Sequence, residues 1–277
     1  MNAQQDNHNE HIVDSSVIFS PFDARDYHIQ YPCAVEYPEE FSLNMCSVKN
    51  QYNISSCTAT AMAGIIEYYN KEQEKVYAPM SIGYLYGNRV FTDYKGQGFN
   101  VRAMLKTAQK YGDAYEKDFP WNVEVPKAIE LYENRDKSID ESAEKNRISS
   151  YYRVTSESEI KYALTQGCPI LFAMKWYKSK VKDGILVFDK TKEQGAHAMI
   201  IYGWNKTGWL VQNSWGSLWG VDGRVTIPYE EPITELWAVT DNITDGKIEY
   251  KKPNCITRLC QKICNLLFGI LKLLSKK

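Results

Sequence analysis

The sequence predicts an α+β protein in which helices dominate the first half of the chain and strands dominate the second. Residues 57–71 and 101–111 have the composition and apolar spacing of helices. From residue 168 onward, short β-branched and aromatic runs are broken by Gly, Asn and Lys, a pattern typical of antiparallel strands. Elements segregated in this way are expected to form two packed halves with a cleft between them.

The ends of the predicted helices carry recognisable signals. The two serines before residue 57 are N-cap candidates for the first helix, and Gly112 follows the second helix as a C-terminal signal. Residues 127–147 are highly charged and have helical propensity. Ser156 and Glu159 form a capping box, which predicts one more helix before the strand-rich half begins.

The strand-rich half contains the runs CPILFAMKWY, GILVF, HAMIIYGW, GWLVQNSW, GRVTI and ELWAVT, which predict an antiparallel sheet or barrel. Residues 198–204 and 208–213 are separated by a short polar loop. If these two runs pair as a hairpin, the side chains of His197 and Asn213 come together at one edge of the sheet.

Composition excludes some classes of function. The 277 residues are 44% hydrophobic, enough for a sizeable core, and the formal net charge of −1 gives no sign of nucleic-acid binding. The polar N-terminus, MNAQQDNHNEH, lacks a basic start followed by an apolar run, so no secretory signal is expected. We therefore expect a cytoplasmic or virion-associated protein.

The seven cysteines show neither C-x-x-C pairs nor the Cys/His spacing of a metal site. Reduced thiols in a cytosolic-type compartment are the simplest interpretation, and a Cys33–Cys46 disulfide stays open as the alternative. No metal and no other cofactor is expected.

Cys57 is the candidate nucleophile. Cysteine attacks a carbonyl as its thiolate, and a helix N-terminus together with a nearby histidine lowers the pKa of a thiol. Cys57 stands at the predicted start of a helix. Three of the four histidines lie in the first 36 residues, so His197, which opens an apolar strand, is the candidate base.

Two further side chains complete the candidate site. Asn213 can orient the imidazole of His197 through its amide oxygen. The side-chain amide of Gln51 and the backbone N–H of Cys57 can donate to the oxyanion that develops on an attacked carbonyl. Taken singly, each residue also fits a structural role, because a cysteine before a helix or a histidine in a strand is more often part of the core.

Three blocks in this order, VKNQYNISSC, GAHAMIIYGWN and WLVQNSWGSLWGVDG, resemble the papain family of cysteine peptidases. The resemblance covers about residues 37–245, and TELWAVTDN and SPFDARDY look like bacterial or phage-type members. It implies a papain-like fold, with a helical left subdomain, an antiparallel β-barrel-like right subdomain and the active-site cleft between them. The resemblance implies that Cys57 is the nucleophile, His197 the general base and acid, and Asn213 the residue that orients the histidine. It also implies that Gln51 donates to the oxyanion. Trp215 would cover the Cys–His–Asn network from water, and Trp219 would pack beneath it.

The resemblance also implies contacts with substrate. Gly98 matches the family's glycine whose backbone pairs with an extended substrate, and Gly96 is the alternative. Ala198 and Val239 would wall the apolar S2 pocket.

The chain departs from the family's pattern near the motifs. Thr58 follows the nucleophile in place of tryptophan, Ile54 stands where the family has a disulfide-bonded cysteine, and Ala196 precedes the histidine in place of Asn or Asp. These changes affect substrate preference and stability more than the catalytic groups. Only about 36 residues precede the domain, fewer than in the usual inhibitory propeptide. Either this lead-in crosses the cleft or latency is controlled in another way.

The chain is expected to divide into an extended or pro-like lead-in (1–36), the peptidase domain (37–245), a linker (246–254) and a cationic amphipathic helix (255–277). Residues 251–277 hold seven Lys or Arg and no Asp or Glu. A wide apolar face with purely positive charge suits an anionic membrane surface. Docking on the body or on a partner protein is the alternative, and disorder is the third. The three cysteines of this tail are candidates for acylation.

The leading hypothesis is therefore a cysteine endopeptidase that acts on a peptide or protein substrate through an acyl-enzyme. The alternatives are a transpeptidase or amide ligase with the same site, and a peptide-binding module that does not cleave. Through residues 255–277, the protein is also expected to bind a membrane peripherally or to bind a partner protein.

Overall fold

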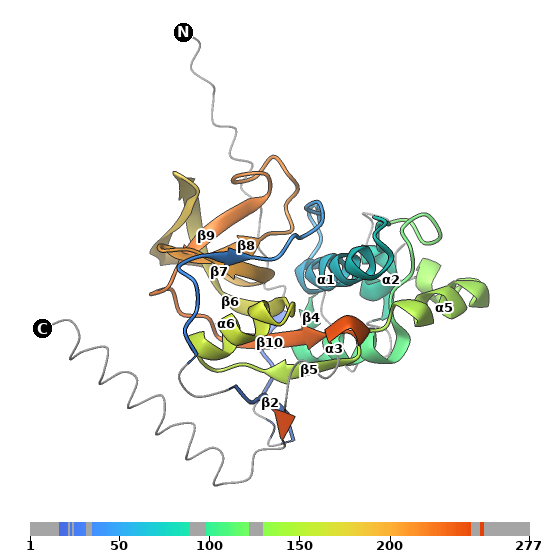
Figure 1. Cartoon of the computed structure of the whole chain (residues 1–277). Coiled ribbons are helices and arrows are strands. Elements are labelled where there is room, and N and C mark those ends of the chain that lie inside the picture. The colour runs from blue at the N-terminus through green and yellow to red at the C-terminus, as the bar shows by residue number, and fades with distance from the viewer. Residues whose placement is uncertain are drawn as a thin grey trace, which may run out of the picture.

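The structure is a computed structural model that describes residues 17–21, 23, 25–31, 35–88, 98–121, 130–244 and 250–251. Gly96, most of the predicted linker and the predicted cationic helix lie outside these residues. In Figure 1, helices α1, α2, α3 and α5 gather on the right of the view, and strands β6, β7, β8 and β9 lie on the left. The predicted α+β organisation is confirmed.

The main helices are α1 (Cys57–Glu74), α2 (Ile82–Gly87), α3 (Val101–Tyr111), α5 (Lys137–Ala143) and α6 (Glu157–Thr165), with the short 3-10 helices η2 (Glu144–Asn146) and η3 (Asn242–Thr244). The strands are β1 (Val17–Ile18), β2 (His28–Ile29), β3 (Phe41–Ser42), β4 (Phe99–Asn100), β5 (Ser150–Arg153), β6 (Ile170–Lys182), β7 (Ile185–Trp204), β8 (Gly208–Gln212), β9 (Arg224–Pro228), β10 (Glu235–Thr240) and β11 (Tyr250–Lys251).

Helix α1 begins at Cys57, as predicted, and runs one turn further than expected. It passes Lys71 and ends at Glu74, because Lys75 takes a left-handed φ of 58° and its N–H donates to Lys71 O at 2.9 Å. Ser56 occupies the predicted N-cap position, but its side chain makes no capping hydrogen bond. The positive end of the α1 dipole lies at Cys57, where it favours negative charge.

The other helix signals are confirmed. Helix α3 ends at Gly112, which has a φ of 73°. In α6, Ser156 Oγ accepts a hydrogen bond from Glu159 N–H at 3.3 Å, and the Glu159 carboxylate in turn accepts from Thr155 N–H. Within the charged segment, residues 130–133, α5 and η2 are helical.

A long hairpin of β6 and β7 forms the centre of the sheet. The predicted runs 184–188 and 197–204 are two parts of one strand, β7, rather than separate strands. The chain turns at Asp183 and Gly184, whose φ values are 52° and 75°. Two successive positive φ values fit the tight turns that match the twist of paired antiparallel strands.

The strands of the large sheet follow the order β11-β2-β5-β10-β6-β7-β8-β9. The pairing of β7 with β8, in which Ile200 lies opposite Gln212, confirms the predicted hairpin. Strand β9 also reaches the start of β7, where Ile185 lies opposite Thr226. The sheet thus curls toward a barrel without closing into one among the described strands.

Two hydrophobic clusters fill most of the interior. The first lies between α1, α2, α3 and the sheet and includes Cys57, Phe99 and Ala198. The second lies between the sheet and α6. In the first cluster α1 approaches the sheet closely, because a Cβ on Gly64 would lie only 3.2 Å from Ile200 Cδ1. This close approach brings the helix that carries the cysteine against the strand that carries the histidine.

The thiol of Cys46 is free and buried, so the disulfide with Cys33 that the sequence left open is not formed. Burial, reinforced by the carboxylate of Glu67, raises the pKa of Cys46 to about 11. This thiol therefore stays protonated at neutral pH.

Short strands outside residues 37–245 add to the fold. In the lead-in, β1 pairs with β4, and β2 pairs with β5. Within the predicted linker, Tyr250–Lys251 forms β11, which pairs with β2. In the described part of the chain, no helix combines the length and the apolar composition needed to cross a bilayer.

Candidate active site

Cys57 is the first residue of α1 and is fully buried. Its Sγ lies 4.0 Å from the Oγ1 of Thr58, the residue that replaces the family's tryptophan. The Thr58 hydroxyl also donates to Phe99 O at 3.4 Å. Thr58 therefore connects the start of α1 to β4, the strand that follows Gly98. The other two departures, Ile54 and Ala196, are buried members of the same hydrophobic cluster.

The predicted pair of His197 and Asn213 is formed. His197 Nε2 lies 2.7 Å from Asn213 Oδ1, and both residues are buried. The same Oδ1 accepts a hydrogen bond from the backbone N–H of Ser214 at 2.8 Å, so this atom is an oxygen and acts as an acceptor. Nε2 must then carry a proton, and Nδ1 is the basic nitrogen of the neutral imidazole.

Aromatic rings surround this imidazole. Trp215 stacks on the His197 ring with centroids 4.9 Å apart and planes inclined by 22°. Trp219 meets Trp215 edge-on at 5.1 Å, in agreement with the predicted packing. Trp176 contacts both the His197 and the Trp215 rings edge-on, at 5.1 and 5.2 Å. These rings hold the imidazole orientation and exclude water from its bond to the asparagine.

Trp176 is a contributor that the sequence reasoning missed. It lies on β6, opposite Gly195 of β7 and two register positions from the pair formed by Met174 and His197. The sequence does contain a signal for this contact: Gly195 lies two residues before His197, and a glycine in a strand leaves room for a large side chain such as Trp176 on the paired strand. It becomes usable only when the register of the hairpin is known.

The amide of Gln51 is fixed by hydrogen bonds at both ends. Its Oε1 accepts from the hydroxyl of Ser214, and its Nε2 donates to Ile54 O at 2.8 Å. An amide nitrogen carries two hydrogens, so one remains for another acceptor. The backbone N–H of Gln51 also donates to Ser214 O at 2.8 Å. Ser214 thus holds both Gln51 and Asn213, a linking role that the sequence motifs did not reveal.

The predicted substrate-binding edge is in contact with the lead-in. Gly98 is buried and leads directly into β4. Strand β1 pairs in parallel with β4, with Val17 opposite Phe99 and Ile18 opposite Asn100. It also lies against β7, the strand of His197. Val17 is only 6% exposed and belongs to the cluster that includes Cys57.

Ala198 and Val239, the predicted walls of an apolar substrate pocket, are both fully buried in this first cluster. Val239 O accepts a hydrogen bond from Tyr69 Oη at 2.7 Å. Val17 of the lead-in belongs to the same hydrophobic cluster.

A network of charges holds the lead-in in place. The carboxylate of Asp26 contacts Arg102 at 2.6 Å and Arg153 at 3.4 Å. Arg102 also donates to Pro21 O at 2.7 Å. These groups bind the segment just after β1 to α3 and β5.

A second set of polar contacts holds the same segment at Ser20. Its backbone N–H donates to Glu235 Oε2 at 2.8 Å, and its hydroxyl lies 3.1 Å from Asn100 Oδ1. The Ser20 hydroxyl also accepts from Arg102 N–H at 3.1 Å. The lead-in is thus fastened to the edge strand β4, to β10 and to the start of α3.

The described residues contain no group of three or more His, Cys, Asp or Glu side chains placed to hold a metal ion. The side chains of the candidate site are instead a thiol (Cys57), an imidazole (His197) and two amides (Asn213 and Gln51); hydrogen bonds join His197 to Asn213 and, through Ser214, link Asn213 with Gln51. Together they can activate a sulfur nucleophile and stabilise an oxyanion.

Comparisons with known proteins agree with this arrangement. A protein-family model described as "Papain family cysteine protease" matches residues 32–235. An uncharacterised peptidase C1-like protein of Acanthamoeba polyphaga mimivirus is 29% identical over 231 aligned positions, and the match covers 75% of this chain and 73% of that protein. A cysteine proteinase of Theileria parva is 28% identical over 208 aligned positions, and the match covers 72% of this chain and 44% of that protein.

Solved structures show the same fold. Xylellain, a cysteine protease from Xylella fastidiosa, matches with a TM-score of 0.69 at 22% identity, over 82% of this chain and 97% of that chain. A procathepsin B from Trypanosoma congolense matches with a TM-score of 0.62 at 15% identity, over 83% of this chain and 86% of that chain.

Proposed function

The chain belongs to the papain family of cysteine proteases, and from this premise we propose that it hydrolyses peptide bonds through an acyl-enzyme on Cys57. The observation that carries this proposal is the hydrogen-bonded series of Ser214, Asn213 and His197. It makes Nδ1 the basic nitrogen of a buried imidazole on the strand that packs against α1, which begins with the thiol.

In the first half of the reaction, His197 Nδ1 takes the proton of the Cys57 thiol, and Sγ attacks the carbonyl carbon of the substrate. The electron pair of the carbonyl moves to its oxygen. The free Nε2 hydrogen of Gln51 and the backbone N–H of Cys57 donate to that oxyanion. The C–N bond then breaks, and the imidazolium gives its proton to the leaving amine.

In the second half, His197 takes a proton from water as the water oxygen attacks the thioester carbon. The C–S bond breaks, the acyl group leaves as a carboxylic acid and the sulfur regains its proton. Asn213 keeps Nε2 protonated throughout, so Nδ1 is the only nitrogen that exchanges a proton. The rings of Trp176 and Trp215 keep water away from this orienting hydrogen bond.

We further infer that the substrate must displace the lead-in. An extended substrate that binds the edge of β4 uses the same main-chain groups that β1 now occupies. The contacts of Ser20 and Asp26 stabilise the covered state, in which β1 occupies the edge of β4. Activity is therefore expected to rise when these contacts are weakened.

Labelling with an epoxide inactivator of thiol peptidases, followed by mass-spectrometric mapping of the modified residue, tests the proposal. We expect one adduct per chain, on Cys57, and its loss in His197→Ala. The matched control is His28→Ala, which removes a histidine of β2 outside the site and should leave labelling intact. Adducts on Cys46 or Cys168 with Cys57 unmodified would overturn the proposal.

A further inference from the structure

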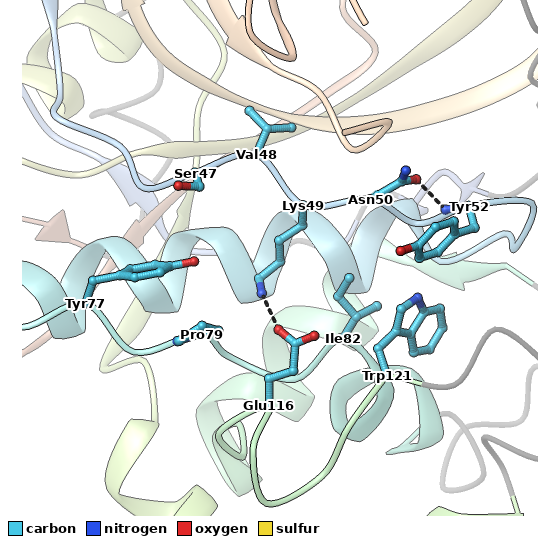
Figure 2. Close-up of a pocket in the computed structure, with 10 residues that line it drawn as sticks. All are labelled: Ser47, Val48, Lys49, Asn50, Tyr52, Tyr77, Pro79, Ile82, Glu116 and Trp121. Atoms are coloured by element: carbon cyan, nitrogen blue, oxygen red, sulfur yellow. Dashed lines mark hydrogen bonds and ion pairs between the residues drawn. The ribbon is translucent and has the colours of Figure 1, made fainter. Parts of the chain in front are cut away.

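A pocket of about 210 Å³ lies beside the candidate active site and contains none of its catalytic groups. Figure 2 shows it between the segment that leads to Gln51, the start of α2 and the loop at 116–121. It is smaller than the roughly 300–1,000 Å³ typical of sites for whole small molecules. Its size fits a single side chain. The residues that line it are Ser47, Val48, Lys49, Asn50, Tyr52, Tyr77, Pro79, Ile82, Glu116 and Trp121.

Aromatic rings lie at both ends of this pocket. Tyr52 and Trp121 lie near each other at one end, Tyr77 lies at the other, and Ile82 and Pro79 form an apolar floor between them (Figure 2). Tyr52 is 51% exposed and Tyr77 is 47% exposed. Large rings left open to solvent around a hollow provide faces for a bound group.

The position of Tyr52 is itself unusual. Its φ is 54°, a left-handed conformation that is uncommon for a bulky residue other than glycine. Asn50 maintains this conformation, because its Oδ1 accepts from Tyr52 N–H at 2.7 Å. The strained turn keeps the Tyr52 ring at the mouth of the pocket, and such conformations are found at ligand clamps.

The charges around the pocket are unbalanced. Lys49 Nζ contacts Glu67 at 2.6 Å, Met80 O at 2.7 Å and Glu116 at 3.5 Å. Its three hydrogens are therefore committed, with the closest carboxylate being the buried Glu67. The Glu116 side chain is 44% exposed and faces the hollow. Two carboxylates thus share one ammonium, and Glu116 is the weaker-held partner.

These carboxylates affect the pKa values of neighbouring groups. Burial, with help from the carboxylates of Glu67 and Glu116, raises the pKa of Tyr77 to about 12. Burial also raises the pKa of Asp113 and that of Glu67 above their usual ranges. Lys49 and Glu116 both line the pocket, and the ammonium lies closer to Glu67 (2.6 Å) than to Glu116 (3.5 Å), so the Glu116 carboxylate is the one that a second cation can share.

The pocket also offers a hydrogen-bond donor. Trp121 Nε1 has no solvent contact and finds no acceptor among the residues that the structure describes. A buried indole N–H normally has a partner. A peptide carbonyl next to a bound cation would supply the missing acceptor.

We propose that this pocket binds a lysine or arginine side chain of the substrate polypeptide, outside the residues that undergo cleavage. The cation would pair with Glu116 and lie against the rings of Tyr52 and Trp121. A main-chain carbonyl of the same peptide would accept from Trp121 Nε1.

Residues 49–51 connect the pocket to the proposed catalytic groups, and main-chain hydrogen bonds fix this segment. Gly216 N–H donates to Lys49 O at 3.0 Å, and Asn50 forms a β-bridge with Trp215. The next residue is Gln51, the proposed oxyanion donor. A polypeptide held in the cleft can therefore continue past Gln51 into the pocket. This choice of occupant rests on the proposed hydrolysis, whereas the recognition of a cation does not.

The test uses dodecapeptides of otherwise uncharged sequence in which one lysine, or one norleucine as control, is moved along the chain. Binding to full-length Cys57→Ala protein is measured by fluorescence anisotropy. We expect lysine at one position to bind about tenfold more tightly than norleucine, because an ion pair and a cation–π contact act together. Glu116→Gln should remove this preference. Glu72→Gln, which changes a half-buried carboxylate on α1 that pairs with Lys75 and does not line the pocket, should keep it.

The same peptides given to the wild-type enzyme separate this inference from the proposed function. A lysine preference that depends on Glu116 in the Cys57→Ala protein, without cleavage by the wild type, would support the pocket and contradict hydrolysis. Cleavage with no lysine preference at any position would support hydrolysis and overturn the pocket. Trp121→Phe provides a second variant, since it keeps the ring but removes the donor and should weaken binding several-fold.

Discussion

Replacing Asp26 with asparagine tests whether the lead-in restrains the active site. The Asp26 carboxylate is the point at which the lead-in contacts two arginines of the body, at 2.6 Å and 3.4 Å. The carboxylate is 8% exposed, and the Arg102 and Arg153 side chains are 10% and 15% exposed. Asparagine keeps the shape of the side chain and removes its charge, so the substitution weakens the fastening without opening a cavity.

The size of the effect follows from the kind of bond that is lost. A hydrogen bond to a charged group stabilises a protein by about 1.5–3 kcal/mol. Loss of this amount from the covered state raises the uncovered population by a factor of roughly 10–150, because about 1.4 kcal/mol corresponds to a tenfold change. Since substrate needs the edge of β4, kcat/KM should rise by about tenfold or more, until the uncovered state dominates.

The assay is hydrolysis of a fluorogenic peptide, with the concentration of competent enzyme set by active-site titration. Asp23→Asn is the matched control, because it changes a carboxylate of the same segment that pairs with the exposed Arg25. Thermal unfolding shows whether either variant destabilises the body. If Asp26→Asn unfolds at the wild-type temperature and its kcat/KM equals that of wild type, the idea that the lead-in restrains the site is wrong.

Four further outcomes are expected. Gln51→Ala should lower kcat by about 10²–10³-fold with little change in KM in steady-state assays, because it removes one oxyanion donor. Trp176→Ala should lower the free energy of unfolding by about 3–5 kcal/mol in denaturant titrations, because it empties a fully buried site beside His197. At pH 8, Cys57 should react with iodoacetamide while Cys46, with its pKa of about 11, stays unmodified, and Cys46 should gain reactivity only as the pH rises toward 11. Full-length protein should float with anionic liposomes whereas a chain that ends at residue 245 should not, and equal flotation of the two would contradict membrane binding by the cationic tail.

The side chains of the candidate site could be identified in the sequence because their signals are local. A nucleophile at the start of a helix, a histidine that opens a strand and an asparagine in the neighbouring strand each have a short sequence context. Two apolar runs separated by a short polar turn predict the hairpin of β7 with β8. This hairpin places His197 Nε2 2.7 Å from Asn213 Oδ1. Local pattern and local pairing were enough for this part of the site.

Contacts that depend on register or on a side-chain conformation could not be predicted in the same way. Trp176 reaches His197 only through the pairing of β6 with β7. Ser214 links Gln51 with Asn213 through one hydroxyl and one N–H, although the residue is part of a motif whose named roles belong to its neighbours. Both residues occur in the quoted runs, and only the folded arrangement gives them a role at the site.

The lead-in illustrates the limit of composition as a guide to latency. Strand β4 has only two residues, and the two residues of β1 are enough to pair with both of them. A pairing of two such short strands has little stability by itself. The polar contacts of Ser20 and Asp26 with β10, α3 and β5 add to the stability of this arrangement. Two of those contacts are ion pairs of the single carboxylate of Asp26, which is why its replacement is the sharpest test of the proposed covering. As proposed above, substrate displaces this short segment while the body stays folded.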